Sequence, residues 1–221
     1  RIDKIKDIRP DIDQVAIDGK AILFESGIYA KIPNDLPENL ALSALDVAGA
    51  PAQVAKLVKP GDTVLIIGAG GKSGMLCCYE AKKRAGVTGK VIGMCHSQRS
   101  TDRLKALGFC DYVFSGNATQ PVPVMEEIEK LTDGKMCDVT INNVNITDTE
   151  MTSILCTKDD GVVYFFSMAT SFTKAALGAE GVGKDVTMIV GNGYTKGHAE
   201  ITLQELRESE ALRKIFTELY A

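Results

Sequence analysis

Short apolar runs alternate with amphipathic segments through most of the chain. Six of these runs have the composition of strands, and they occupy residues 63–67, 90–95, 112–114, 137–142, 162–166 and 186–190. Uninterrupted apolar runs of this kind are typical of strands that are buried on both faces of a parallel sheet. Helical patterns occupy residues 75–84, 100–107, 122–131 and, as one amphipathic helix, about 201–219. Strands that alternate with helices predict an α/β fold with a doubly wound parallel six-stranded sheet.

The first sixty residues do not show this alternation. Two apolar runs, 14–17 and 20–24, flank the turn dipeptide Asp18-Gly19 and predict a β-hairpin. Residues 29–33 predict another short strand, and residues 37–58 are helical in pattern with a break expected at Gly49-Ala50-Pro51. The pieces before residue 40 are too few to close a core, so we expect them to pack on other material.

Composition excludes several classes of function. The 221 residues carry a net charge of −4 with bases scattered among acids, which argues against nucleic-acid binding. No apolar run is long enough to span a membrane, and no signal peptide is recognisable. The six cysteines form no C-x-x-C pair and only two histidines are present, so no metal site is expected within the chain. A cytoplasmic location fits this cysteine usage.

The stretch from Thr63 to Gly74 carries the strongest chemical signal. A predicted strand ends at Ile67, four glycines follow at positions 68, 70, 71 and 74, and a predicted helix comes next. This order brings free backbone N–H groups and the positive end of the helix dipole to one point, which is a favourable place for a phosphate anion.

Two phosphate-binding loops could use these glycines. A P-loop would use Lys72 and Ser73, but it needs a glycine five positions before Gly71, where the chain has Ile66. A dinucleotide turn would use the glycines for the strand exit, the pyrophosphate approach and close helix packing. The spacing G-x-G-G-x-x-G is one residue longer than the usual dinucleotide motif. On the motif alone, a glycine-rich turn that binds no ligand is an alternative interpretation. The surrounding βα units favour the dinucleotide.

Three segments, 45–50, 59–65 and 68–74, resemble the medium-chain dehydrogenase/reductase superfamily. The resemblance implies a Rossmann domain at residues 41–200 and a C-terminal helix at 201–221. It also implies that residues 1–40 are the tail of a β-rich N-terminal catalytic domain that lies outside this sequence. The start at Arg1, inside a charged segment, suggests the later part of a longer polypeptide.

Within the superfamily, the resemblance points to the amine-oxidising dehydrogenases of lysine fermentation. It implies a small amino-acid substrate, L-erythro-3,5-diaminohexanoate, which is oxidatively deaminated to 5-amino-3-oxohexanoate. Many members use zinc, which the absent part could hold. We expect the chain alone to be inactive, because substrate would bind between two domains, and a homo-oligomer is left open. Alternative interpretations are a zinc-independent quinone or enoyl reductase and a non-catalytic NAD(P)-sensing module.

The end of the second predicted strand should distinguish NAD from NADP. NAD-binding proteins usually place an acid there, whereas this chain has no acid between Cys95 and Asp102. Ser97 and Arg99 could hold the 2′-phosphate of NADP through charge-assisted hydrogen bonds. Alternatively, Arg99 caps a helix and faces water. The resemblance implies NAD, so both cofactors remain candidates.

Other polar residues follow predicted strands. Lys72 could shield pyrophosphate charge or be a solvated loop lysine. Asn142 and Asn143 could bind the nicotinamide end or form a mutual hydrogen bond or an Asx turn. The segments 167–171 and 191–194 lie on the same rim, and no residue is assigned as catalytic. The cofactor-binding candidates are Gly68, Gly70, Gly71, Lys72, Ser73, Gly74, Ser97, Arg99, Asn142, Asn143, Val144 and Ser167.

Overall fold

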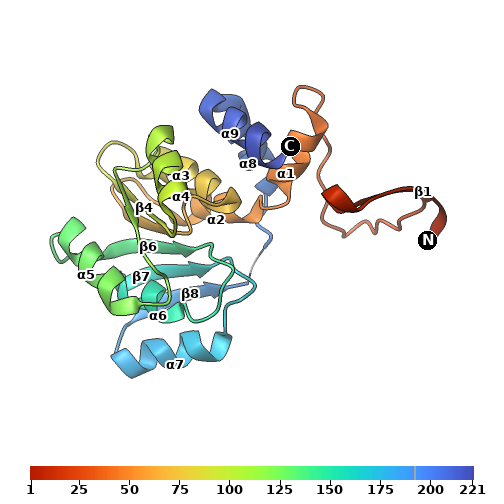
Figure 1. Cartoon of the computed structure of the whole chain (residues 1–221). Coiled ribbons are helices and arrows are strands. Elements are labelled where there is room, and N and C mark those ends of the chain that lie inside the picture. The colour runs from red at the N-terminus through yellow and green to blue at the C-terminus, as the bar shows by residue number, and fades with distance from the viewer. Residues whose placement is uncertain (192) are drawn as a thin grey trace. The chain divides into compact units, whose positions relative to one another are not determined.

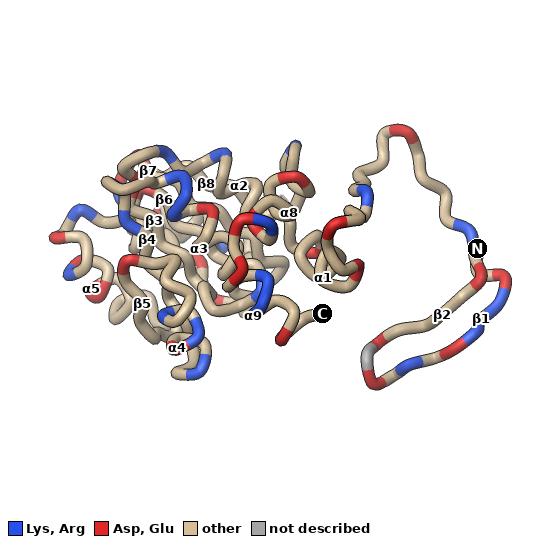
Figure 2. The backbone as a smooth tube through the Cα atoms, turned by 90° about the horizontal axis from the view of Figure 1, so that it is seen from above, with Lys and Arg blue, Asp and Glu red and all other residues tan. Residues whose placement is uncertain are grey.

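The computed structural model describes residues 1–191 and 193–221 and divides the chain into two compact units, Arg1–Lys31 and Ile32–Ala221. The first unit is an antiparallel hairpin of β1 (Ile2–Arg9) and β2 (Gln14–Gly19), joined by the 3₁₀ turn η1 (Pro10–Ile12). Acidic and basic residues both lie along β1 (Figure 2).

The hairpin predicted around Asp18-Gly19 is therefore wrong. The chain reverses at residues 10–13 instead, where Asp13 adopts a left-handed φ of 53°, and Asp18-Gly19 ends β2. The observed register pairs Ile5 with Ile17 and Ile8 with Val15, so apolar residues face each other across the strands. This cross-strand pairing competes with the local turn preference of the Asp-Gly dipeptide. Residues 20–24 and 29–33 form no strand, contrary to expectation.

The second unit is built on a six-stranded parallel sheet with the strand order β5-β4-β3-β6-β7-β8. The strands are β3 (Thr63–Ile67), β4 (Lys90–Cys95), β5 (Tyr112–Ser115), β6 (Cys137–Asn142), β7 (Thr157–Phe165) and β8 (Val186–Val190). All six predicted strands are confirmed, and β7 begins five residues earlier than expected. The strand order reverses between β3 and β6, which is where a doubly wound sheet binds its ligand.

Helices cover both faces of this sheet (Figure 1). One face carries α1 (Glu38–Leu45), α2 (Gly49–Leu57), α3 (Lys72–Ala85), α4 (Gln98–Leu107), α8 (His198–Glu208) and α9 (Glu210–Tyr220). The opposite face carries α5 (Pro121–Leu131), α6 (Glu150–Leu155) and α7 (Phe172–Val182). Alternation along β3 supplies both cores, because Val64 and Ile66 face α3 while Leu65 and Ile67 face α5.

Two helix boundaries differ from the prediction. The break expected at residues 49–51 lies at 46–48, because Pro51 fits the first turn of α2, where its missing N–H costs nothing. The single C-terminal helix is two helices, since Ser209 is extended and its side chain caps α9. The segment Thr147-Asp148-Thr149-Glu150 has the sequence of a capping box, but the box is not formed, and Glu150 Oε1 instead accepts a hydrogen bond from the Ser171 N–H at 2.7 Å.

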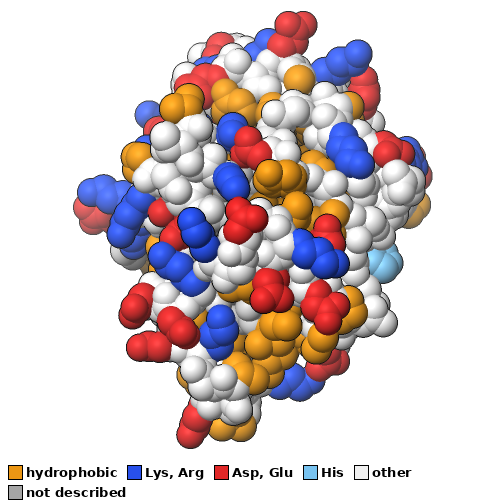
Figure 3. All heavy atoms as spheres, turned by 90° about the vertical axis from the view of Figure 1, so that its left-hand side faces the viewer, with side chains coloured by type: hydrophobic (Ala, Val, Ile, Leu, Met, Phe, Trp, Pro, Cys, Tyr) orange, Lys and Arg blue, Asp and Glu red, His pale blue; other side chains and the backbone are white. Residues whose placement is uncertain are grey.

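On the face of the molecule drawn in Figure 3, acidic and basic side chains are interspersed, and neither kind forms a separate patch. In the described part of the chain, no helix combines the length and apolarity that crossing a membrane requires.

Candidate functional site

The glycine turn connects the end of β3 to α3 under tight steric constraints. Gly68 has a φ of +81°, and a Cβ there would lie 2.9 Å from Val144 Cγ2. The N–H groups of Gly68 and Ala69 both donate to the Met94 carbonyl at 3.0 Å, which fixes the turn to the end of β4. Only glycine satisfies the backbone conformation and the space at position 68.

Two more glycines let helices approach this turn. A Cβ on Gly74 would lie 2.2 Å from the Gly68 carbonyl oxygen, so α3 packs directly on the strand exit. A Cβ on Gly70 would lie 2.7 Å from Ser100 Cβ, so α4 packs on the turn from the other side. The packing role predicted for Gly74 is confirmed.

The start of α3 offers backbone donors to a ligand. Gly71 is the N-cap residue, and no side chain in the described residues caps this helix. The Gly71 N–H is used internally, because it donates to the Gly68 carbonyl at 3.0 Å. The next amides, those of Lys72 and Ser73, belong to the first turn, where no intrahelical acceptor exists. These donors and the helix dipole favour an anion at this point.

A cavity of about 420 Å³ opens beside the turn at the carboxyl ends of β3, β4, β5 and β6. Its volume lies within the range of about 300–1,000 Å³ that is usual for small-molecule sites. Apolar side chains make most of its wall, and a few polar groups join them. The lining residues are Gly68, Gly70, Gly71, Met94, Cys95, His96, Ser100, Gly116, Ala118, Asn143, Val144 and Ile146.

Asn143 lines this cavity and has an unsatisfied side-chain donor. Its Oδ1 lies 3.9 Å from Cys77 Sγ, a weak contact, while its Nδ2 is buried and has no hydrogen-bond partner among the described residues. Buried polar atoms are nearly always paired, so an orphan amide at a cavity wall marks a place for a ligand acceptor.

Asn142 has a different environment, although it is the adjacent residue. It is fully buried, and its Nδ2 donates to Thr149 Oγ1 and Ser153 Oγ, each at 2.9 Å. Its Oδ1 accepts from the Val144 N–H at 3.0 Å, which is an Asx turn. The structure therefore places Asn142 between β6 and α6, away from the cavity.

Three further candidates do not line the cavity. The Lys72 ammonium lies 2.8 Å from Asp46 Oδ2 and 5.5 Å from the centre of the Tyr220 ring. Ser73 is buried in the first turn of α3, and Ser167, after β7, accepts a hydrogen bond from the Ala169 N–H through its Oγ at 3.1 Å. Of the rim segment expected at 191–194, Asn192 lies outside the described residues.

The residues after β4 differ in role, because some stabilise α4 or face solvent and others line the cavity. Ser97 caps α4, because its Oγ accepts from the Ser100 N–H at 3.2 Å in a reciprocal capping box. Arg99 is exposed in the first turn of α4, and neither Ser97 nor Arg99 lines the cavity. Ser97, and not Arg99, therefore caps the helix, while the exposure of Arg99 agrees with the alternative in which it faces water.

Sequence reasoning missed two residues here. His96 lines the cavity directly after β4, and its position at a strand end could have identified it. Arg103 Nη1 donates to the Gly70 carbonyl at 3.2 Å and ties α4 to the glycine turn. Arg103 lies one helical turn beyond Arg99, a spacing that places both on one helix face.

The cavity contains no activated nucleophile. Burial raises the pKa of the Cys95 thiol, against opposing hydrogen bonds from Ser100 and the Gly70 amide, so the thiol stays neutral at pH 7. Among the described residues, no three His, Cys, Asp or Glu side chains lie close enough to hold a metal ion. The arrangement can bind and orient a nucleotide.

Comparison with known proteins identifies relatives. A family model described as zinc-binding dehydrogenase matches residues 73–201. L-erythro-3,5-diaminohexanoate dehydrogenases from Acetoanaerobium sticklandii and Fusobacterium nucleatum are 64% and 61% identical over 220 residues, which is the whole chain but only 64% of either relative. The mycobacterial protein Rv1454c, solved as a complex with NADPH, has a TM-score of 0.58 at 20% identity, over 86% of this chain and 58% of that one. This last likeness shows the fold alone.

Proposed function

The chain belongs to the zinc-binding dehydrogenase family, and from this premise we propose that it is the cofactor-binding part of an NAD(P)-dependent oxidoreductase. The diphosphate of the nucleotide would bind the first-turn amides of α3 at Lys72 and Ser73. The rest of the nucleotide would occupy the 420 Å³ cavity. When bound, a nicotinamide nucleotide supplies the hydride acceptor.

One observation carries this proposal. The start of α3 has no side-chain cap, and it lies beside a cavity into whose wall Asn143 brings a buried amide without a partner among the described residues. In a glycine turn without a ligand, a side chain would be expected to satisfy such donors. Here the donors and the open volume occur together, at the point where the strand order reverses.

For the reaction, we propose oxidative deamination of L-erythro-3,5-diaminohexanoate to 5-amino-3-oxohexanoate in lysine fermentation. The support is the identity of 64% and 61% to two dehydrogenases with that name, along the entire chain. The 221-residue chain would hold and orient the nucleotide and shield it from water. The six free cysteines are in keeping with a cytoplasmic location.

We further propose that residues 1–40 are the tail of a β-rich catalytic domain, that residues 41–200 bind the cofactor and that residues 201–221 close the C-terminal side. The support lies in the first unit taken by itself. Ile2, Ile5 and Ile8 on β1 are each more than half exposed, so the hairpin has apolar side chains without cover within its own unit. A chain of this extent should bind cofactor and lack turnover.

Titration of the 221-residue chain with NADH and NADPH, followed by nucleotide fluorescence, tests the binding proposal. We expect saturable binding of at least one nucleotide and its loss in Gly74→Val, whose side chain would invade the turn. Absence of binding of both nucleotides at millimolar concentration would refute it. Turnover of the diamino acid by the whole protein tests the substrate separately.

A non-catalytic NAD(P)-sensing module is the second candidate. It is favoured by the composition of the cavity wall, where His96 and the neutral thiol of Cys95 are the only titratable side chains among the described lining residues. The same fluorescence titration would succeed for such a module. Hydride transfer to NAD(P) by the whole protein with the diamino acid would exclude it.

A further inference from the structure

A second cavity, of about 470 Å³, lies apart from the nucleotide site and shares no lining residue with it. Its walls come from α2, the end of α3, the segment after β8 and the first turn of α8. Nothing in the proposed dehydrogenase function uses it. The charged side chains among its described lining residues, however, are all basic.

Three basic side chains, Lys56, Arg84 and Lys196, line this cavity, and none of its described lining residues is acidic. The chain as a whole has more acids than bases, 29 against 25. A wall with three positive charges is therefore contrary to the general balance of the molecule. Neither lysine forms an ion pair with any described residue. Their charges are available to a ligand.

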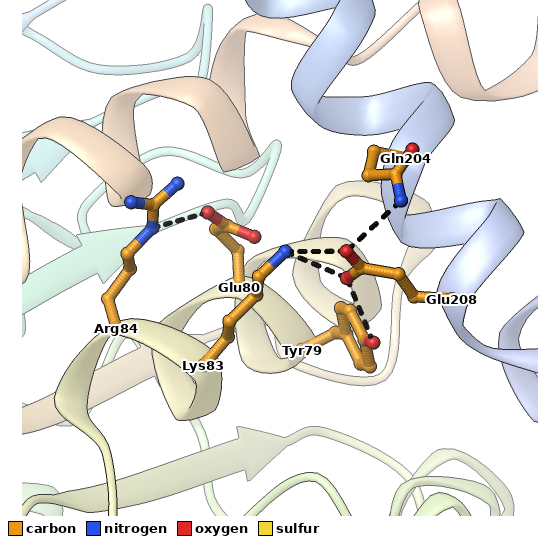
Figure 4. A network of polar contacts seen from close by, with 6 residues as sticks. All are labelled: Tyr79, Glu80, Lys83, Arg84, Gln204 and Glu208. Carbon is orange, nitrogen blue, oxygen red and sulfur yellow. Dashed lines mark hydrogen bonds and ion pairs between the residues drawn. The ribbon is translucent and has the colours of Figure 1, made fainter.

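A buried carboxylate holds the side chain of Arg84 in place. Its Nε donates to Glu80 Oε1 at 2.7 Å, and Glu80, one helical turn earlier in α3, is 1% exposed. Only Nε of the guanidinium is joined to Glu80, and the two terminal nitrogens are not (Figure 4). A guanidinium anchored through Nε keeps a pair of parallel donors, which is the geometry that recognises two oxygens of one oxyanion.

Neutral donors complete the wall. Gln53 is 2% exposed, and its Oε1 accepts a hydrogen bond from Thr195 Oγ1 at 2.7 Å. This bond fixes the amide and leaves the two N–H groups of Nε2 without a partner among the described residues. The helix α8, which begins at His198 beside the cavity, also has no side-chain cap within the described chain. Each of these donors suits an anionic oxygen.

We propose that this cavity is a second binding site, specific for a phosphate group carried by a small metabolite or free in solution. Arg84 is the bidentate partner, Lys56 and Lys196 neutralise the remaining charge, and Gln53 donates a hydrogen bond. A dianionic phosphate matches three basic side chains better than a single carboxylate does. Because the wall joins α2, α3 and the segment after β8, an occupant would also hold these elements together.

Isothermal titration of the 221-residue chain with inorganic phosphate, at an ionic strength held constant with chloride, tests the proposal. Saturating nicotinamide nucleotide is present throughout, so that the start of α3 is occupied. We expect one phosphate to bind per chain, and acetate to bind at least about ten-fold more weakly for want of the second charge. Glucose 6-phosphate, compared with glucose, shows whether a metabolite-borne phosphate is accepted.

Variants locate the site. Arg84→Gln should weaken phosphate binding about ten-fold through loss of a charge-assisted pair, and the exposed double variant Lys56→Gln/Lys196→Gln should do the same without disturbing a buried group. Lys130→Gln, on the opposite face of the sheet, should bind phosphate like the parent. The proposal is overturned if the double variant binds phosphate as tightly as the parent does. It is also overturned if the parent gives no more heat with phosphate than with chloride. If Arg84→Gln does not fold, the double variant decides alone.

Discussion

Glu205 should make the stability of the chain fall as pH rises. Its side chain on α8 is fully buried, and neither carboxyl oxygen has a hydrogen-bond partner among the described residues. Burial raises the pKa of Glu205 well above 4.5, and the negative charge of Glu80 on α3 raises it further. The ammonium of Lys83 opposes this shift, together with Arg84, but both bind other carboxylates, as Figure 4 shows. In the folded chain, Glu205 therefore keeps its proton to a higher pH than an ordinary glutamate does.

The magnitude follows from linkage between proton binding and folding. Between pH 4.5 and the raised pKa, the folded chain holds a proton at Glu205 that the unfolded chain releases, so stability is greatest below this interval and is lost through it. One such proton costs about 1.4 kcal/mol of unfolding free energy per pH unit. From pH 5 to pH 7 the loss is up to about 2.7 kcal/mol, which corresponds to about 5–11 °C in Tm for a domain of this size.

The assay compares thermal unfolding of the parent and Glu205→Gln from pH 5 to pH 8. Glutamine has nearly the same shape and cannot ionise, so the variant removes the titration and keeps the packing. We expect the variant to gain stability over the parent as pH rises. Glu208→Gln is the matched control. The hydrogen bond from Lys83 lowers the pKa of Glu208, so this carboxyl is mostly ionised in both the folded and the unfolded chain from pH 5 to pH 8, and its replacement should lower Tm by nearly the same amount across that range. Parallel Tm profiles for the parent and Glu205→Gln would refute the reasoning.

Four other substitutions test the nucleotide site. Gly74→Ala places a Cβ 2.2 Å from the Gly68 carbonyl oxygen, so we expect a loss of about 1–3 kcal/mol in chemical denaturation, together with weaker nucleotide binding. Asn143→Ala should raise the Kd for nucleotide about ten-fold with little change in Tm, whereas Asn142→Ala should lower Tm because it leaves buried hydroxyls unpaired. Arg99→Gln should weaken NADPH binding about ten-fold and leave NADH binding unchanged, as measured by fluorescence titration.

The sheet could be predicted because its signal is local and redundant. The inner strands β3, β4 and β6 are almost entirely buried, and burial on both faces of a parallel sheet selects apolar residues at successive positions. The glycine turn was likewise recognisable, since the positive φ at Gly68 and the close approach of backbone to backbone at Gly74 leave no alternative residue. In these stretches the local preferences and the tertiary fold agree.

The ends of the chain were predicted less well because their structure depends on partners distant in sequence. The turn preference of Asp18-Gly19 is overridden by the pairing of β1 with β2. The split between α8 and α9 depends on Ser209, which the amphipathic pattern passes over without a break. Glu150 has the spacing of a capping box, yet the Ser171 amide, twenty-one residues later, takes its carboxylate. A local sequence pattern does not reveal such contacts, which override the local preference for a turn, a helix or a cap.

The pair Asn142-Asn143 shows where reasoning from sequence could have gone further. Side chains alternate between the faces of a strand, so two adjacent residues at a strand end cannot both face one cavity. Val139 and Ile141 of β6 pack in the core with α3, which puts Asn142 on the opposite face, toward α6. Asn143, one step further, returns to the side of the glycine turn. Once the face of β6 that packs against α3 is known, this alternation alone separates the residue that supports the sheet from the one that can meet a ligand.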